Sequence, residues 1–343
     1  MEYKFINREI SWLQFNERVL QEACDPNVPL LQRLQFLGIF SNNQDEFFKV
    51  RVANIMRLCR SRKNAKKMLT GDYTPESLLE ELNDKIALLQ EHFSATYRTV
   101  LAEMERESIF VVNEKNLSEE QKEFCRSYFA QILSPRLVPL IIRKSVRLPF
   151  LPDGNSYLGV KMSHKNRRSV RYAVVRIPTS SACPRFVVLP SAAGRHDIIF
   201  IDDIIRLMID HIFFMFSYDE IGVYTFKIMR DAELTYDEDV SKSLFERISE
   251  GVSNRRYGLP IRMIYDRDMP ADMVEILAGK LGLDNSEMLA PGERYHMMKD
   301  LMKFPKVRPD LLYAPQRPIQ HPSISLFSSI LEVIARRDIF LNY

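Results

Sequence analysis

Apolar residues recur at three- and four-residue spacing from residue 8 to residue 104, which is the pattern of amphipathic helices. The first helix carries an apolar face made of Trp12, Leu13, Phe15, Val19, Leu20 and Ala23. A second helix runs from Pro29 to a break at Gly38, and a third begins near Ser41. This part of the sequence predicts several helices joined by short turns.

The longest helix follows a clear start signal. Thr74 supplies an N-cap, Pro75 a first helical residue with a fixed φ, and Glu76 an acid in the first turn. Apolar positions then keep step as far as Met104, so that the helix is about thirty residues and about 45 Å long. Residues 1–106 are therefore predicted to form an N-terminal helical bundle.

The period of the pattern changes after residue 106. Short apolar runs rich in β-branched and aromatic residues alternate with turn residues, which is typical of strands. Strands are expected near 157–162, 170–177, 185–189, 198–201, 223–228 and 261–265. Helices are expected near 118–133, 203–216, 241–253 and 271–281. Residues 107–303 are predicted to be an α+β domain with a mixed sheet, so that the chain is multidomain, α and then α+β.

The end of the chain has a different character. Five prolines between Pro305 and Pro322 predict a loop-like segment, and a short helix is expected over 324–336. The chain then closes on a strand-like apolar run, 338–343, with no later segment to pair with. We expect residues 304–343 to be a linker that leads to the start of a further, truncated domain.

Composition narrows the class of protein. Apolar residues make up 46% of the chain and charged residues 27%, as in a soluble globular protein. Lys and Arg total 48 and Asp and Glu 45, and the net charge of +3 argues against a general nucleic-acid coat. No apolar run approaches the length of about 20 residues that spans a bilayer, and the N-terminus lacks a signal-peptide pattern. The four cysteines form no CxxC pair, so reduced thiols and a cytoplasmic location are expected.

Several segments match the pattern of one enzyme family in the same order. Residues 7–23 read NREISWLQFNERVLQEA, and residues 29–53 read PLLQRLQFLGIFSNNQDEFFKVRVA. The series continues with RFVVLP at 185–190, TFKIMRDAE at 225–233, RRYG at 255–258 and IRM at 261–263. The series resembles the polyphosphate kinases of the first, histidine-phosphorylating family, and the resemblance covers essentially the whole chain.

The resemblance implies a reversible transfer of the terminal phosphate of ATP to inorganic polyphosphate through a phosphohistidine. In that family the catalytic half consists of two phospholipase D-like modules, which carry the histidines, the phosphate-clamping arginines and the Mg²⁺ site. We expect residues 304–343 to end at the start of that half, so that this chain alone is inactive.

The resemblance also implies partners. ATP, ADP and polyphosphate are expected as substrates, with Mg²⁺ bound by the missing catalytic half. The α+β domain, the head or middle domain of the family, is expected to support a homodimer or a higher homo-oligomer. Peripheral contact with the inner membrane stays open, and no nucleic acid is expected.

The histidines do not form a phosphohistidine site in the sequence. Such a site needs a nucleophilic imidazole that is oriented by a carboxylate or carbonyl and faced by cations. None of the six stands in a His-x-Lys pattern followed by Asp: His92, His164, His196, His211, His296 and His321. We assign no catalytic and no metal-ligating residue to this chain.

Asn43 is the candidate nucleotide-binding residue. Ser41 with Gln44, and Asn43 with Glu46, each fit a capping box at the start of the third helix, so capping is the simplest explanation of these residues. By the resemblance, however, Asn43 matches a residue that contacts ATP. Its amide offers a donor and an acceptor side by side, which suits an adenine edge. Asp45 and Glu46 in the first turn of that helix would repel phosphate, so the phosphates are assigned to the missing half.

A basic run over residues 49–67 is the other candidate feature. It contains no acid and eight cations: Lys49, Arg51, Arg57, Arg60, Arg62, Lys63, Lys66 and Lys67. Two interpretations stay open, steering of polyphosphate and a solvated helix face that runs into a basic loop. The run has no GxxxxGK[ST] motif, which excludes a P-loop.

Two other classes of protein remain as alternatives. The first is a non-catalytic anion-binding or scaffold protein built from the same two domains. The second, weaker alternative is RNA binding, which is disfavoured because the basic run lacks interleaved aromatic residues.

Overall fold

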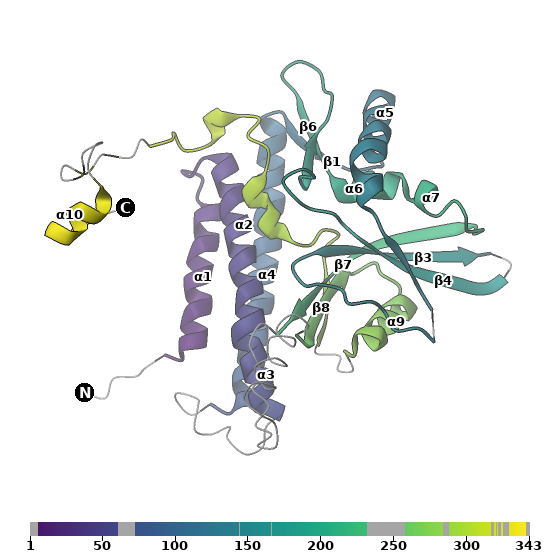
Figure 1. The fold of residues 1–343 in the computed structure, drawn as a ribbon, viewed down its shortest axis with the longest axis horizontal. Helices are drawn as coiled ribbons and strands as arrows, with labels where there is room; N and C mark the ends of the chain where they lie inside the picture. The colour runs from purple at the N-terminus through teal and green to yellow at the C-terminus, as the bar shows by residue number, and fades with distance from the viewer. Residues whose placement is uncertain are drawn as a thin grey trace.

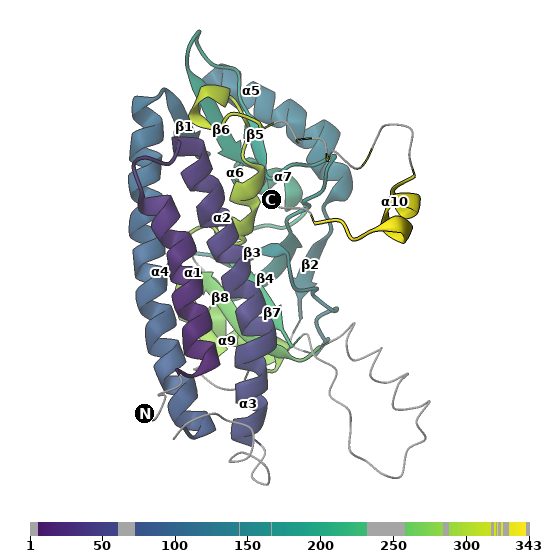
Figure 2. The same cartoon turned by 90° about the vertical axis from the view of Figure 1, so that its left-hand side faces the viewer.

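The computed structural model describes residues 6–60, 73–143, 145–165, 167–231, 258–283, 288–316 and 329–340, and the single residues 319, 321 and 324. The helix expected over 241–253 lies outside these ranges. The N-terminal part is helical, as predicted, with the elements α1 (Arg8–Cys24), α2 (Leu30–Phe47), the π-helical turn η1 (Phe48–Val52), α3 (Ala53–Arg60) and α4 (Pro75–Arg106). α1, α2 and α4 lie side by side, and α3 continues beyond the end of α2 (Figure 1, Figure 2).

The start signal of the long helix is confirmed. The Thr74 side chain accepts a hydrogen bond from the Ser77 amide, and the Ser77 hydroxyl accepts one from the Thr74 amide, which is a reciprocal capping box. α4 then buries Leu78, Leu82 and other positions of the predicted apolar face. The cap and the apolar period together explain why α4 runs without interruption from Pro75 to Arg106.

Gly38 does not break a helix, and the predicted division of α2 into two helices is wrong. α2 continues through Gly38 and Ser41 to Phe47. A Cβ at Gly38 would lie 2.8 Å from the amide nitrogen of Met302, which belongs to the short helix η6 (Met298–Lys303). Glycine is needed here because a backbone from the far end of the α+β part packs directly on the helix.

The described residues of the α+β part form two sheets. The larger has the order β2-β4-β3-β7-β8-β9, and the smaller the order β1-β6-β5. The strands are β1 (Ile109–Val112), β2 (Pro139–Ile142), β3 (Ser156–His164), β4 (Arg167–Arg176), β5 (Phe186–Val188), β6 (His196–Phe200), β7 (Glu220–Arg230), β8 (Pro260–Asp266) and β9 (Leu289–Gly292). The β1–β6 and β8–β9 pairs are parallel and the other pairs antiparallel, which confirms mixed sheets.

Helices cover both faces of the larger sheet (Figure 1). One face packs on α5 (Glu119–Tyr128), α6 (Ile201–Leu207) and α7 (Ile209–Ile212), and the other on α9 (Ala271–Leu281). Neighbouring residues of β3 alternate accordingly, since Leu158 joins the first core and Tyr157 the second.

The smaller sheet lies between the helical bundle and the α5–α7 core, because Ile198 of β6 packs into the bundle and Ile199 into the α5–α7 core. The bundle core also takes up Leu301 and Phe304, so the end of the α+β part returns to the helices.

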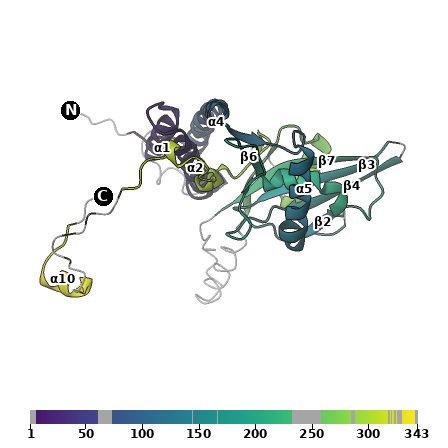
Figure 3. The same cartoon turned by 90° about the horizontal axis from the view of Figure 1, so that it is seen from above.

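Two further helices can be compared with their predicted bounds. The helix expected over 203–216 is divided into α6 and α7, and within the segment expected as a helix over 324–336 the structure describes α10 (Ile330–Arg336). α10 lies apart from the rest of the described chain (Figure 3). Among the described residues, no helix is both long and apolar enough to cross a membrane.

Candidate functional site

Asn43 lies about one turn before the end of α2, on the side that faces α1. Its Nδ2 donates to Oδ1 of Asn16 at 3.1 Å. Asn16 is fully buried, and its Nδ2 in turn donates to the Phe40 carbonyl at 3.2 Å and to Oε1 of Gln44 at 3.3 Å. We call these four residues the amide ladder. It joins α1 to α2 and leaves Asn43 partly exposed.

The capping boxes predicted at Ser41 and Asn43 are not formed, because α2 has already run for about three turns when it reaches Ser41. Asp45 and Glu46 therefore lie in the last turns of α2 and not in a first turn, and the electrostatic argument that placed phosphate elsewhere does not hold. Instead, Oδ1 of Asp45 lies 2.7 Å from Nζ of Lys227 on β7. Only 9% of each side chain is exposed, so this ion pair ties the bundle to the larger sheet.

The described part of the basic run is paired with carboxylates. Lys49 contacts Asp153 at 3.1 Å, and Arg57 contacts Asp231 at 2.9 Å. Burial lowers the pKa of Lys49, but the carboxylates of Asp153 and Glu46 outweigh it and raise that pKa above its ordinary value. The Arg60 side chain and the cations Arg62, Lys63, Lys66 and Lys67 lie outside the described residues.

Two further arginines stand beside this run, and neither forms an ion pair with a carboxylate in the described ranges. Arg230 at the end of β7 donates to the carbonyls of Leu151 and Gly258. Arg262 on β8 lies over the Phe48 ring, 4.2 Å from its centroid, and its Nε has no hydrogen-bond partner among the described residues. Burial lowers the pKa of Arg262 to about 10, although the charge of Asp45 opposes the shift. We call this region the η1 junction, made of Asp45, Lys49, Arg57, Lys227, Arg230 and Arg262.

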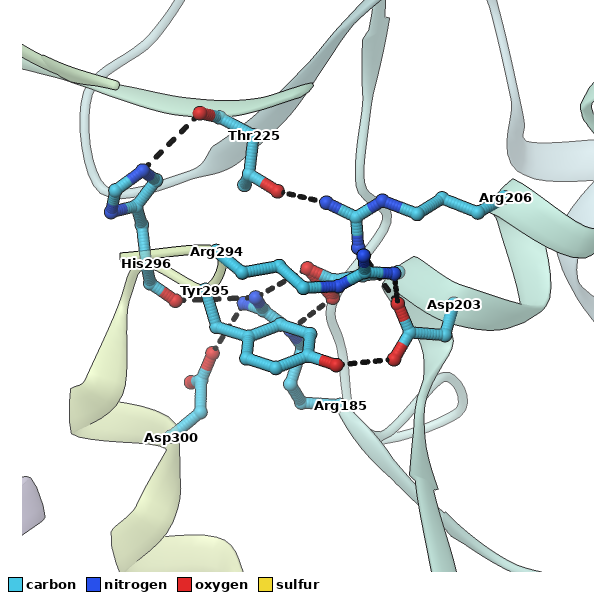
Figure 4. A network of polar contacts seen from close by, with 9 residues as sticks. Arg185, Asp203, Arg206, Thr225, Arg294, Tyr295, His296 and Asp300 are labelled. Atoms are coloured by element: carbon cyan, nitrogen blue, oxygen red, sulfur yellow. Dashed lines mark hydrogen bonds and ion pairs between the residues drawn. The ribbon is translucent and has the colours of Figure 1, made fainter. Parts of the chain in front are cut away.

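A second polar region lies where β5, α6, β7 and the segment before η6 meet (Figure 4). Arg185 binds both oxygens of Asp202 at 2.6 Å and reaches Oδ2 of Asp300 at 3.1 Å and the His296 carbonyl at 3.2 Å. Burial raises the pKa of Asp202, while Arg185 opposes the shift. The bidentate contact with Arg185 compensates the charge of Asp202, which is completely buried.

Asp203 is the second centre of this region. It accepts from Arg206 at 2.8 Å, from Arg294 at 2.9 Å and from the Tyr295 hydroxyl at 2.6 Å. Arg294 also binds Glu114 at 2.6 Å. We call the whole set the Arg185 network, made of Arg185, Asp202, Asp203, Arg206, Arg294, Tyr295 and Asp300. Its cations and acids pair with one another, which is the arrangement of a structural junction.

The histidines lie in separate places. His296 is buried, and its Nε2 lies 3.2 Å from the Thr225 carbonyl. Burial and the charge of Lys227 lower its pKa to about 3, so it is neutral near pH 7. His92 lies beside Cys24 and His164 beside Asp219, and His211 packs against Phe129. His196 lies on β6, and His321 is described only as a single residue. In the described ranges, no three or more His, Cys, Asp or Glu side chains cluster as metal ligands.

Comparison with known proteins identifies the family. The model of the polyphosphate kinase middle domain matches residues 120–304, which is more than half of the chain. The model of the polyphosphate kinase N-terminal domain matches residues 5–112. The chain belongs to the polyphosphate kinase family. The resemblance seen in the sequence is thereby confirmed.

Curated relatives carry the name of the same family. The polyphosphate kinase of Vibrio cholerae is 40% identical over 99% of this chain and 48% of its own length. That of Escherichia coli K12 is 37% identical over 99% of this chain and 49% of its own length. The crystal structure of polyphosphate kinase from Porphyromonas gingivalis matches 98% of this chain and 47% of that chain, with a TM-score of 0.76 and 26% identity. The chain thus spans about half the length of the curated relatives it matches.

The segments that carried the resemblance build the two polar regions. RFVVLP places Arg185 before β5, and TFKIMRDAE places Lys227 and Arg230 on β7. Sequence reasoning missed Asn16, although a signal existed. Asn16 shares a helix face with Leu13 and Leu20, and a polar residue on an apolar face needs a buried partner. Arg262 gave no such signal, because strand positions near a turn carry charged residues without any special role.

Proposed function

We propose that this chain forms the N-terminal and middle domains of a polyphosphate kinase, which transfers the terminal phosphate of ATP reversibly to inorganic polyphosphate through a phosphohistidine. The observation that carries the proposal is the match of both family models together with 40% identity over 99% of the chain. By the family resemblance, the phosphorylated histidine is assigned to the half of those relatives that this chain does not span.

In this proposal the helical bundle supplies one wall of the nucleotide pocket through Asn43. The amide ladder uses one Nδ2 hydrogen of Asn43. Its Oδ1 and its other Nδ2 hydrogen have no partner among the described residues, and the side chain is partly exposed. An acceptor and a donor on one exposed amide match the amino group and a ring nitrogen of adenine.

Polyphosphate is the second substrate in this proposal, and the charges of the described residues indicate which side of the molecule it would approach. Lys49 and Arg57 are already neutralised by Asp153 and Asp231, which reduces what they contribute to attraction of an anion. Steering by the basic run therefore depends mainly on its cations outside the described ranges. Arg262 and Arg230 hold positive charge without a carboxylate partner in those ranges, and this favours the same side of the molecule.

The remaining parts of the proposal follow from the family. Mg²⁺ would enter with the phosphates of ATP, whose crowded charge it neutralises, and it would be held by the other half of the enzyme. The α+β domain would support a homodimer or a higher homo-oligomer. The cytoplasm is the proposed compartment, with peripheral contact at the inner membrane as a further location.

The test is a paired assay on the purified chain. Calorimetry would measure ATP binding by the unaltered chain, by Asn43→Ala and by the control Asn27→Ala, whose side chain lies on a surface turn. We expect Asn43→Ala to weaken ATP binding about tenfold, the value of one well-placed amide pair, and Asn27→Ala to leave it unchanged. Incubation with γ-labelled ATP should label neither the chain nor polyphosphate.

Two results would contradict the proposal. Stable labelling of the chain would place the phosphorylated histidine here and not in the other half. Polyphosphate binding without any ATP binding would support the alternative, a non-catalytic anion-binding or scaffold protein.

A further inference from the structure

We infer that Asn16 is a positioning residue that turns the side-chain amide of Asn43 so that its Oδ1 faces the nucleotide, and that the site thereby selects purines with an amino group at position 6. The inference rests on the proposed contact between Asn43 and the nucleotide. It adds the residue that sets the orientation of that contact and the chemical group that the contact recognises.

The orientation of Asn16 follows from its partners. Its side chain touches the Phe40 backbone carbonyl at 3.2 Å, and a carbonyl can only accept a hydrogen bond. The group directed at Phe40 must therefore be Nδ2. The second Nδ2 hydrogen is taken by Oε1 of Gln44 at 3.3 Å. Only Oδ1 of Asn16 remains for Asn43.

The orientation of Asn43 follows in turn. Because Oδ1 of Asn16 is an acceptor, Asn43 must present its Nδ2, and the distance between the two atoms is 3.1 Å. A flipped Asn43 would set two oxygens against each other beside a fully buried side chain, which leaves a buried acceptor without a donor. The Phe40 carbonyl of α2 thus sets the orientation of Asn16 on α1, and Asn16 in turn determines which end of the Asn43 amide is free.

The packing around the ladder holds this geometry in place. Trp12 and Phe47 lie about one turn from Asn16 and Asn43, and their rings stack with centroids 4.6 Å apart. Leu13 and Leu20, on the same face of α1 as Asn16, are 1% and 0% exposed. The two helices therefore cannot slide past each other to give Asn43 another partner.

The free edge of Asn43 consequently carries an acceptor at a fixed place. The amino group of adenine donates to such an acceptor, whereas a purine with oxygen at position 6 brings a second acceptor to it. ATP and inosine triphosphate (ITP) differ at position 6 and in the protonation of N1, and they share the ribose and the phosphates. We expect ATP to bind about tenfold more tightly than ITP, as for one good hydrogen bond exchanged for a repulsive contact.

The experiment measures ATP and ITP binding by calorimetry for the unaltered chain and two variants. Asn16→Leu keeps the branched shape of the side chain but removes the ladder, so Asn43 is free to turn and the preference should fall to about twofold or less. Asn16→Asp is the conservative variant. Its buried carboxyl group holds a proton, which it donates to Phe40, while its carbonyl oxygen still accepts from Asn43. We expect this variant to keep the preference for ATP.

The controls separate positioning from stability. Gln121→Leu removes another buried amide, which bonds Asp197 and the Pro190 carbonyl in the α+β part, and it should leave the preference unchanged. Urea unfolding of each variant shows that it is folded. An Asn16→Leu protein that is folded and keeps the tenfold preference would overturn the inference alone, as would an unaltered chain without any preference. Equal ATP binding by Asn43→Ala and the unaltered chain would overturn the proposed contact between Asn43 and the nucleotide as well.

Discussion

The Arg185 network and the η1 junction both hold buried cations where the helical bundle meets the α+β domain, but they balance those charges differently. In the network, Arg185 meets Asp202 and Asp300, and each neighbouring arginine also reaches a carboxylate. In the η1 junction, Lys227 meets Asp45, whereas Arg230 has two carbonyls and the Phe150 ring, and Arg262 the Phe48 ring, among the described residues. The ion pairs of the first region are complete, and the second contains two guanidinium groups without a described carboxylate partner.

The difference indicates that the Arg185 network and the η1 junction have different roles where the helical bundle meets the α+β domain. Buried ion pairs whose every partner is present resist any rearrangement, because removing one member leaves an uncompensated charge. Arg230 and Arg262 have no carboxylate partner in the described ranges, so no ion pair of this kind holds them in place. Asn43 lies on α2 two residues before Asp45, but its side chain faces Asn16 of α1, whereas that of Asp45 faces Lys227 of β7.

The largest expected effect comes from breaking the Arg185 network. Arg185→Met would leave Asp202 completely buried without its cation, and we expect the free energy of unfolding to fall by about 3–5 kcal/mol. Arg262→Met is the matched control, since it removes a cation on which no described carboxylate depends, and it should cost less than about 1 kcal/mol. Urea unfolding followed by circular dichroism measures both. Similar losses would show that the two regions do not differ as described.

A smaller effect is expected from the buried ion pair between Asp45 and Lys227 in the η1 junction. Asp45→Asn keeps the shape of the side chain but removes the charge that faces Lys227, and we expect a loss of about 2 kcal/mol in the free energy of unfolding. The double variant Asp45→Leu with Lys227→Met should lose less free energy of unfolding than Asp45→Leu alone or Lys227→Met alone, because no charge then stays buried without a partner. Strictly additive losses in this double-mutant cycle would show that the two side chains do not interact.

The smallest expected effect is a pH dependence from His296, which borders the Arg185 network. Its pKa of about 3 in the folded chain lies below the ordinary 6.5, mainly because of burial, with Lys227, Arg185 and Arg206 contributing. Between these values the unfolded chain binds a proton that the folded chain does not, so stability falls as the pH falls.

We therefore expect the unaltered chain to lose about 1 kcal/mol more than His296→Gln between pH 7.5 and pH 5.5. Glutamine keeps a donor for the Thr225 carbonyl and does not titrate. Urea unfolding at several pH values gives the two curves. Parallel curves would mean that His296 takes up its proton without cost in the folded state.

Much of the local structure could be predicted from the sequence. The cap at Thr74, the apolar period of α4 and the alternating strands of the larger sheet were each correctly predicted, because these signals act over a few residues. The short strands β1, β2 and β9 were not predicted. Each has four residues, too few to show an alternation.

The candidate site was less accessible to sequence reasoning. Asn43 was identified only through the family resemblance, and its surroundings were placed wrongly. The local sequence around Gly38 and Ser41 is compatible both with a helix boundary and with the interior of a helix. The deciding contact, the Met302 backbone against Gly38, comes from a segment more than 260 residues later.

The sequence by itself therefore determined the family, the helical bundle and the α+β character, because apolar period, caps and turn residues are local properties. Only the tertiary structure decided that α2 is one helix, that Asp45 meets Lys227 across 182 residues, and that Asn16 orients Asn43. A buried polar side chain takes whichever partner packing brings within hydrogen-bond distance, and that choice depends on how distant segments fill the core together.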